Sequence, residues 1–326
     1  STDAGIEAMN NDTVLVGGMP IGIYMETDGV MVLNTEQIAG ADGKEHEPAK
    51  GIVKAGDYIM AVDHCEITGK KELLEAVGNL TGTFVVLTVR RNGETIDLKI
   101  KPVEYETGEY RLGIWVRDNV QGLGTVTFLT DQSRFGALGH GIHDVDTSVL
   151  MSIAEGNVYR TSIRDITKGQ SGSPGSMEGM IIYNNYNILG TIDKNTEAGI
   201  YGKIDKIDEL FTEQTAIRTA KKEEIITGPA TIRCFVDNEV REFDIEVTQV
   251  DMMSQEINKG LVIKVTDEEL LEKTGGIIQG MSGSPIIQNG KLIGAVTHVF
   301  VQDSTKGYGI FIENMLKQVN LPEMCG

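Results

Sequence analysis

Residues 282–296 read SGSPIIQNGKLIGAV, and GYGI follows at 307–310. An earlier part of the chain has the same order, with SGSP at 171–174, NILGTI at 187–192 and GIYG at 199–202. In both copies a tight turn of glycine and serine precedes a short apolar stretch of strand length and then a turn that contains glycine. A duplicated six-stranded barrel would produce this repeat. The sequence therefore predicts two similar β units in its second part.

The rest of the chain beyond Val120 is also typical of strands. Residues 125–129 and 243–247 alternate between apolar and polar side chains, and turn residues recur between such stretches. Two segments are instead typical of helices, Asp267–Lys273 and Ile312–Val319. The predicted fold class is mostly β, with a double β-barrel that ends in a C-terminal helix.

The N-terminal part has a different pattern, with short strands around a single helix. Apolar side chains at Leu73, Leu74 and Val77 give the stretch from Lys70 to Val77 helical spacing. A hairpin is predicted next, across a three-residue turn that contains Gly93. We divide the chain into an N-terminal arm at 1–12, a first domain at 13–103, a linker at 104–118 and a barrel domain at 119–326.

The first domain resembles a PDZ domain of the bacterial protease type. The residues that carry the resemblance are Gly56-Asp57, which precede the strand at 59–62, and the final hairpin. In such domains a peptide adds as an extra strand, and backbone N–H groups of a glycine-containing loop hold its carboxylate. In the matching loop we expect Ile21, Gly22 and Ile23 to bind peptide. The alternative is a domain that serves only as a rigid spacer or an interdomain clamp.

The bulk composition argues against several function classes. The 326 residues include 29 basic and 48 acidic side chains, and the formal net charge is −19. Such a surface repels nucleic acid and anionic lipid headgroups, so we expect neither partner. The three cysteines form no disulfide framework, and no apolar run reaches the ~18 residues that cross a bilayer. The start at Ser1 is typical of a mature or trimmed N-terminus, which allows for a removed targeting segment.

Ser282 is the candidate nucleophile. A serine hydroxyl needs a nearby base and hydrogen-bond donors for the developing oxyanion. Glycines on both sides of Ser282 let the backbone turn sharply, and we expect the N–H groups of Gly280 and Ser282 to form the oxyanion hole. Each such donor stabilises the transition state by about 3 kcal/mol. The alternative is an ordinary turn without chemistry.

The candidate base is His140, which ends a predicted strand between two glycines. His143 lies three residues later in a more polar loop, and we interpret it as a surface residue or a hydrogen-bonding neighbour. His298 lies in an apolar strand, where it either forms part of a wall or lines the pocket for a substrate side chain. No HExxH, CxxC or phosphate-binding loop occurs, so we expect no metal and no cofactor.

Three segments together resemble the stage IV sporulation protein B peptidase family of spore-forming bacteria. They are LGH at 138–140, the stretch from Val265 to Pro285, and GAVTHVFV at 294–301. The resemblance implies a PDZ domain before a chymotrypsin-like serine peptidase domain, with Ser282 as nucleophile, His140 as base and Asp267 as acid. In the chymotrypsin template the acid lies far from the serine along the chain. Asp144, Asp146 and Asp193 therefore remain alternative acids, whereas Ser171 corresponds to a loop where the family requires no serine.

The resemblance also implies a biological role. Such a peptidase is exported into the space between the forespore and mother cell membranes, where it cleaves itself, at its own N-terminal segment, and a membrane-bound regulatory protein. Two alternatives remain, a non-catalytic adaptor whose PDZ domain acts on an inert barrel, and a protein-quality-control serine protease. The second usually carries its PDZ domain after the peptidase, the reverse of the order predicted here.

Overall fold

The computed structural model describes residues 12–320, which divide into two compact units. Unit 1 contains the described residues up to Tyr24, residues 121–142 and those from Gly156 onward. Unit 2 contains residues 25–120 and 143–155. These bounds differ from our division of the chain, since residues 13–24 lie in unit 1 and the short segment 143–155 lies in unit 2. The predicted N-terminal arm lies outside the described residues except for Asp12.

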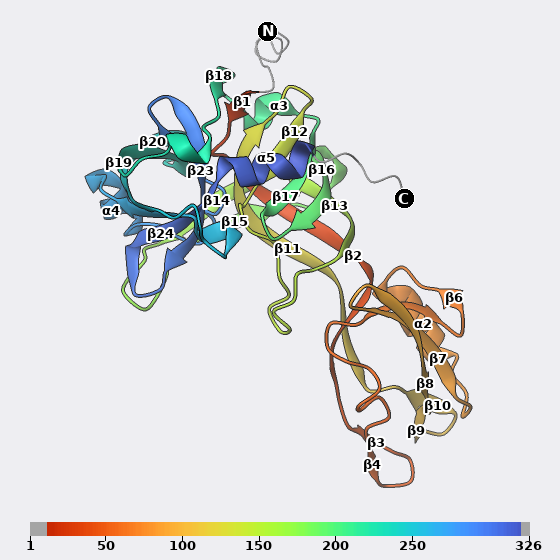
Figure 1. The fold of residues 1–326 in the computed structure, drawn as a ribbon. Coiled ribbons are helices and arrows are strands. Elements are labelled where there is room, and N and C mark those ends of the chain that lie inside the picture. Colours follow the sequence, from red (N-terminus) through yellow and green to blue (C-terminus); the bar gives the residue numbers. More distant parts are fainter. Residues whose placement is uncertain (1–11, 321–326) are drawn as a thin grey trace. The chain divides into compact units, whose positions relative to one another are not determined.

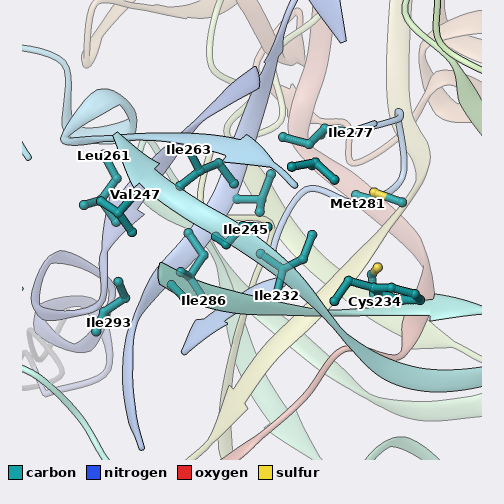
Figure 2. Packing of buried hydrophobic residues seen from close by; sticks show 14 of the residues in the cluster. Ile232, Cys234, Ile245, Val247, Leu261, Ile263, Ile277, Met281, Ile286 and Ile293 are labelled. Atoms are coloured by element: carbon teal, nitrogen blue, oxygen red, sulfur yellow. The ribbon is translucent and has the colours of Figure 1, made fainter. Parts of the chain in front are cut away.

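The C-terminal half of unit 1 is a closed six-stranded barrel (Figure 1). Its strands, in order around the barrel, are β19 (Gly228–Val236), β20 (Glu239–Val250), β21 (Leu261–Val265), β24 (Asp303–Phe311), β23 (Lys291–Phe300) and β22 (Pro285–Gln288). Figure 2 shows side chains such as Ile232 and Ile245 meeting in its interior, where they are 0% and 2% exposed. The alternation predicted for residues 243–247 places Ile245 inside, because successive side chains of a strand point to opposite faces.

The other half of unit 1 is built from a second set of strands. The pairing order runs β11 (Ile114–Leu129), β12 (Arg134–Ala137), β17 (Gly199–Ile204), β16 (Ile188–Thr196), β13 (Ile153–Tyr159) and β2 (Pro20–Thr35), and β2 also pairs with β11. The order thus returns to its first strand, as in a barrel. β1 (Thr13–Val16) pairs with β11 and with β18 (Ala216–Arg218). The prediction of a mostly β fold with a double barrel is confirmed.

The two halves of unit 1 share a buried cluster beneath the C-terminal helix α5 (Ile312–Asn320). Phe128 and Tyr201 from the first half pack in this cluster with Ala295 and Ile310 from the second, and each is completely buried. Met315 of α5 is also fully buried in the cluster. Burial of this apolar surface fixes the two halves against each other, and the candidate active site lies at their junction.

Unit 2 has its own sheet and its own core. Its sheet runs from β2 through β5 (Tyr58–Val62) and β7 (Val85–Arg91) to β8 (Glu94–Ile100). The helix α2 (Lys70–Gly78) covers the core through Leu73, which confirms the predicted helix. The hairpin between β7 and β8 turns on two residues rather than three, because Arg91 pairs with Glu94. The two turn residues both have positive φ, as the tight hairpin turn requires.

The predicted linker at 104–118 is wrong. These residues contain the end of β9 (Val103–Glu106), all of β10 (Glu109–Arg111) and the start of β11. The remaining elements are β3 (Ile38–Ala39), β4 (Glu45–His46), β6 (Cys65–Glu66), β14 (Thr161–Thr167), β15 (Ser176–Ile181), η1 (Asn185–Asn187), α3 (Ile207–Leu210), η2 (Lys222–Glu224), η3 (Ile257–Lys259) and α4 (Glu268–Thr274). No helix in the range 12–320 has the length and apolar character to cross a membrane.

The two described cysteines differ in their surroundings. Cys234 is completely buried in the barrel core, and burial raises the pKa of its thiol to about 12. Such a thiol is a small apolar side chain without reactivity. Cys65 is exposed.

Candidate active site

Ser282 lies in a tight turn that enters β22, and the turn depends on glycine. Gly280 and Gly283 have φ values of 105° and 98°, a region that favours glycine. A Cβ atom on Gly283 would also lie 2.1 Å from the carbonyl oxygen of Thr125. The N–H of Gly283 donates to the carbonyl of Val296 at 2.7 Å. The turn is therefore held against β23 on one side and β11 on the other.

Two threonines of β11 fix the orientation of this turn. Thr125 donates its N–H to the carbonyl of Ser282 at 2.9 Å and its hydroxyl to the carbonyl of Gly280 at 2.8 Å. The Thr127 hydroxyl donates to the carbonyl of Gly283 at 2.7 Å. Both threonines are buried. Our sequence reasoning missed them, and the available signal was their alternate spacing on one face of a predicted strand.

The candidate oxyanion donors are available in this geometry. Met281 and Gln279 direct their carbonyl groups to the N–H groups of Ser284 and Met177, respectively. Because N–H and C=O point in opposite directions across a trans peptide, the N–H groups of Ser282 and Gly280 point away from those partners. No hydrogen bond within residues 12–320 uses either N–H. Both donors remain predicted members of an oxyanion hole.

His140 follows β12 after two residues in the left-handed region. Leu138 has a φ of 68° and Gly139 a φ of 70°. A Cβ atom on Gly139 would lie 2.8 Å from Ile310 and 2.9 Å from Thr297, which belong to β24 and β23. The chain that carries His140 thus passes directly against the C-terminal barrel. Only glycine permits both this approach and this conformation.

The His140 ring has a defined protonation pattern at Nδ1. This nitrogen lies 2.8 Å from the carbonyl oxygen of Gly141. Since a carbonyl oxygen only accepts, Nδ1 carries the proton of this hydrogen bond. In the neutral ring Nε2 then holds the lone pair that a general base requires.

Ser282 and His140 contact two consecutive residues of β23, Thr297 and His298. The Ser282 hydroxyl donates to the carbonyl oxygen of Thr297 at 3.0 Å. The His140 ring stacks on the ring of His298, with centroids 4.8 Å apart and planes 22° apart. The predicted nucleophile and base therefore contact consecutive residues of one strand, and their pairing in catalysis remains a prediction. Since the serine proton points to Thr297, its transfer to His140 requires the hydroxyl to rotate first.

Asp267 is the N-cap of α4, which begins one residue after the predicted helix start. Its carboxylate accepts the N–H groups of Glu269 and Leu270 at 3.1 and 3.2 Å, and that of Asp244 at 3.1 Å. The residue therefore ties α4 to β20. Its role as the acid of a triad remains a prediction.

The three alternative acids all contact arginines. Asp144 and Asp146 bind Arg117 within unit 2. Asp193 of β16 binds Arg134 of β12 through both carboxylate oxygens, across the intervening strand β17 of unit 1. Each carboxylate thus has a structural ion pair.

The other predicted site residues lie as follows. His298 is exposed beside His140, so a place in the substrate pocket stays a prediction. His143 forms an isolated bridge with Leu150 in unit 2. The Ser171 hydroxyl donates to the carbonyl of Gln302 at 2.9 Å. Among the described residues, no three side chains of His, Cys, Asp or Glu gather as metal ligands.

The predicted peptide-binding loop is wrong. Ile21, Gly22 and Ile23 are buried in strand β2 and belong to unit 1. A Cβ atom on Gly22 would lie 2.7 Å from Ile181, so this glycine serves close packing rather than a loop. A short apolar stretch around glycine has the same pattern in both settings, which explains the error.

Unit 2 contains another segment with the required features. Gly113 has a φ of 69°, and its carbonyl accepts the N–H of Glu36 at 2.9 Å. β11 then begins and lies beside α2, since Asp118 accepts the N–H of Lys70 at 2.8 Å. Trp115 on β11 is 58% exposed. A strand beside a helix, preceded by a glycine turn, is the arrangement that PDZ domains use for peptides.

Comparison with known proteins gives a family and several similar structures. The family model described as SpoIVB peptidase S55 matches residues 108–316, and no curated protein matches. The PDZ domain of the SdrC-like protein of Listeria innocua is 24% identical, with a TM-score of 0.23, and covers 28% of this chain and 94% of its own. The active form of the Rv3671c protease of M. tuberculosis is 11% identical, with a TM-score of 0.34, over 64% of this chain and 78% of its own.

A third similar structure is the HtrA-type protease AlgW with a decapeptide. It is 9% identical, with a TM-score of 0.36, over 98% of this chain and 66% of its own. The family model carries the assignment, because it spans well over half of the chain and includes both the His140 loop and the Ser282 turn. The chain is a serine peptidase, and it belongs to the SpoIVB peptidase S55 family.

Proposed function

We propose that this serine peptidase acts in sporulation signalling, where it cleaves itself and a membrane-bound regulatory protein. Its proposed catalytic residues are Ser282 as nucleophile and His140 as base, and the acid that the family resemblance implies is Asp267, whose carboxylate caps α4 in this structure. The observation that supports the assignment is that Ser282 and His140 contact consecutive residues of β23, Thr297 and His298. The role in sporulation rests on the family, and we place the protein between the two membranes of the developing spore.

The proposed reaction begins when the Ser282 hydroxyl turns from Thr297 to Nε2 of His140. His140 takes the proton as the serine oxygen attacks the peptide carbonyl, and the N–H groups of Gly280 and Ser282 stabilise the oxyanion. His140 then gives its proton to the leaving amine, which leaves an acyl group on Ser282. A water molecule, deprotonated by His140, releases the second product. No cofactor enters these steps.

The PDZ-like unit is the proposed recognition element for a protein substrate or for the chain's own N-terminal segment. We assign peptide binding to the strand β11 at residues 114–118 and to the turn at Gly113. The exposed Trp115 and the exposed Leu74 of α2 offer apolar contacts on the two elements. An extended peptide beside β11 would gain main-chain hydrogen bonds, which supply affinity.

The experiment is covalent labelling with a fluorophosphonate probe followed by peptide mapping. We expect the label on Ser282 in the native chain and no label in Ser282→Ala. Peptide hydrolysis and self-cleavage fall by several orders of magnitude in that variant, because triad members act as a unit. Ser171→Ala is the matched control, since it alters the equivalent turn of the repeat and keeps full activity. Label on Ser171 instead would refute the assignment, and no label at all would favour an inert adaptor.

A further inference from the structure

Asn258 forms an unusual set of hydrogen bonds beside the candidate active site. It lies in η3, in the connection between β20 and β21. Its side-chain amide nitrogen donates to the carbonyl oxygen of Gly139 at 2.8 Å and to that of Glu197 at 2.7 Å. Gly139 directly precedes His140, and Glu197 lies in the turn between β16 and β17. One side chain of the C-terminal barrel thus holds two loops of the other half of unit 1.

The backbone of the same residue binds the strand that contacts Ser282. The carbonyl oxygen of Asn258 accepts the hydroxyl of Thr297 at 2.7 Å. The carbonyl of Thr297 in turn accepts the Ser282 hydroxyl. Asn258 is therefore bound at one end to the loop that carries the base and at the other to the residue that holds the nucleophile.

An asparagine is chemically suited to this position. Its NH₂ group has two hydrogens, and each reaches one of the two carbonyl oxygens. Aspartate would place a carboxylate against two carbonyl oxygens, and alanine would leave both without this donor.

We propose that Asn258 is a positioning residue that sets the place of His140 relative to Ser282. The inference rests on the proposed roles of these two residues. A displacement of about 1 Å between catalytic groups costs on the order of 10²-fold in rate. We therefore expect Asn258→Ala to lower kcat roughly 30- to 100-fold with little change in KM. Asn258→Gln, which keeps both donors on a longer stem, restores part of this loss.

The test combines active-site titration with rates. Each variant is titrated with a fluorophosphonate, which gives the fraction of molecules with a reactive Ser282, and the labelling rate per titrated site is then measured. A positioning role predicts full stoichiometry with slow labelling in Asn258→Ala. Simple misfolding predicts the reverse, a reduced stoichiometry with the native rate in the remaining sites. Ser254→Ala is the matched control, because its hydroxyl bonds only within the same connection, to Glu256.

A second variant tests the other end of the link. Thr297→Val removes the hydroxyl that binds Asn258 and keeps the carbonyl that binds Ser282. Both changes interrupt the same path from Gly139 through Asn258 to Thr297. The labelling rate of the double variant should therefore stay within a factor of about three of the rate of Asn258→Ala, rather than fall by the product of the two single effects. A labelling rate in Asn258→Ala equal to that of the native chain would overturn this inference but not the proposed function. Absence of labelling in the native chain would instead overturn the proposed function.

Discussion

Replacement of Asp267 distinguishes the two roles of its carboxylate, the N-cap of α4 and the proposed acid of the triad. In Asp267→Ala the helix α4 loses its N-cap, which costs about 1 kcal/mol, and the bond to the Asp244 N–H, which costs about 1 kcal/mol more. The free energy of unfolding should therefore fall by about 2 kcal/mol. For a unit of this size that corresponds to a decrease in Tm of about 4–8 °C.

Asp267→Asn provides the contrast. Its amide oxygen still caps α4 through Glu269 and Leu270, while its NH₂ group cannot accept from Asp244, so we expect a loss of only about 1 kcal/mol. As the proposed acid, however, Asp267 should not tolerate this change. In the chymotrypsin triad the corresponding replacement lowers kcat about 10⁴-fold, and we expect a loss of at least 10²-fold here.

The assays are thermal unfolding followed by circular dichroism and hydrolysis of a peptide substrate. A Tm of Asp267→Ala equal to that of the native chain would refute the capping argument. Full activity of Asp267→Asn at nearly native stability would refute the role of acid and leave Asp267 as a structural residue. Ser171→Ala again controls for changes that touch neither helix nor site.

Two further predictions concern unit 2. Although burial raises the pKa of Asp144, the hydrogen bonds from the Thr147 N–H and the Arg117 guanidinium outweigh burial and hold this pKa below its usual range. The carboxylate therefore stabilises the fold above about pH 4, and this contribution is lost as the pH falls. The fluorescence of Trp115, the only tryptophan, should report unfolding at acid pH, and the dependence of stability on pH should be weaker in Asp144→Asn than in the native chain. An identical pH dependence of both proteins would contradict this. The same fluorescence should respond to binding of a peptide that copies residues 1–12. The affinity should be at least about tenfold lower when the carboxyl end of the peptide is amidated. Equal affinity of both peptides would exclude carboxylate recognition.

The sequence predicts most of the elements because their signals are local. The apolar spacing of Leu73 and Val77 is enough for α2, and an aspartate before the acidic start of a helix indicates the α4 cap. The repeated SGSP turns and the strands after them indicate the double barrel. The turn at Ser282 is predicted because Gly280 and Gly283 adopt positive φ values, which few other residues can adopt.

What the sequence does not reveal depends on distant contacts. Nothing marks residues 24–25 or 142–143 as boundaries between units, since β2 runs through both units as a single strand and the loop after His140 has no linker composition. The hydrogen bonds of Asn258 join residues 61 and 119 positions apart. Such contacts exist only once both halves of unit 1 have folded, so no pattern within a window of sequence indicates them.

The way the chain alternates between its units has a consequence for proteolytic processing. The chain passes from one unit to the other at residues 24–25, 120–121, 142–143 and 155–156. A single scission at any of these four points therefore leaves residues of both units together on at least one of the two fragments. Complete release of either unit from the other therefore requires more than one scission.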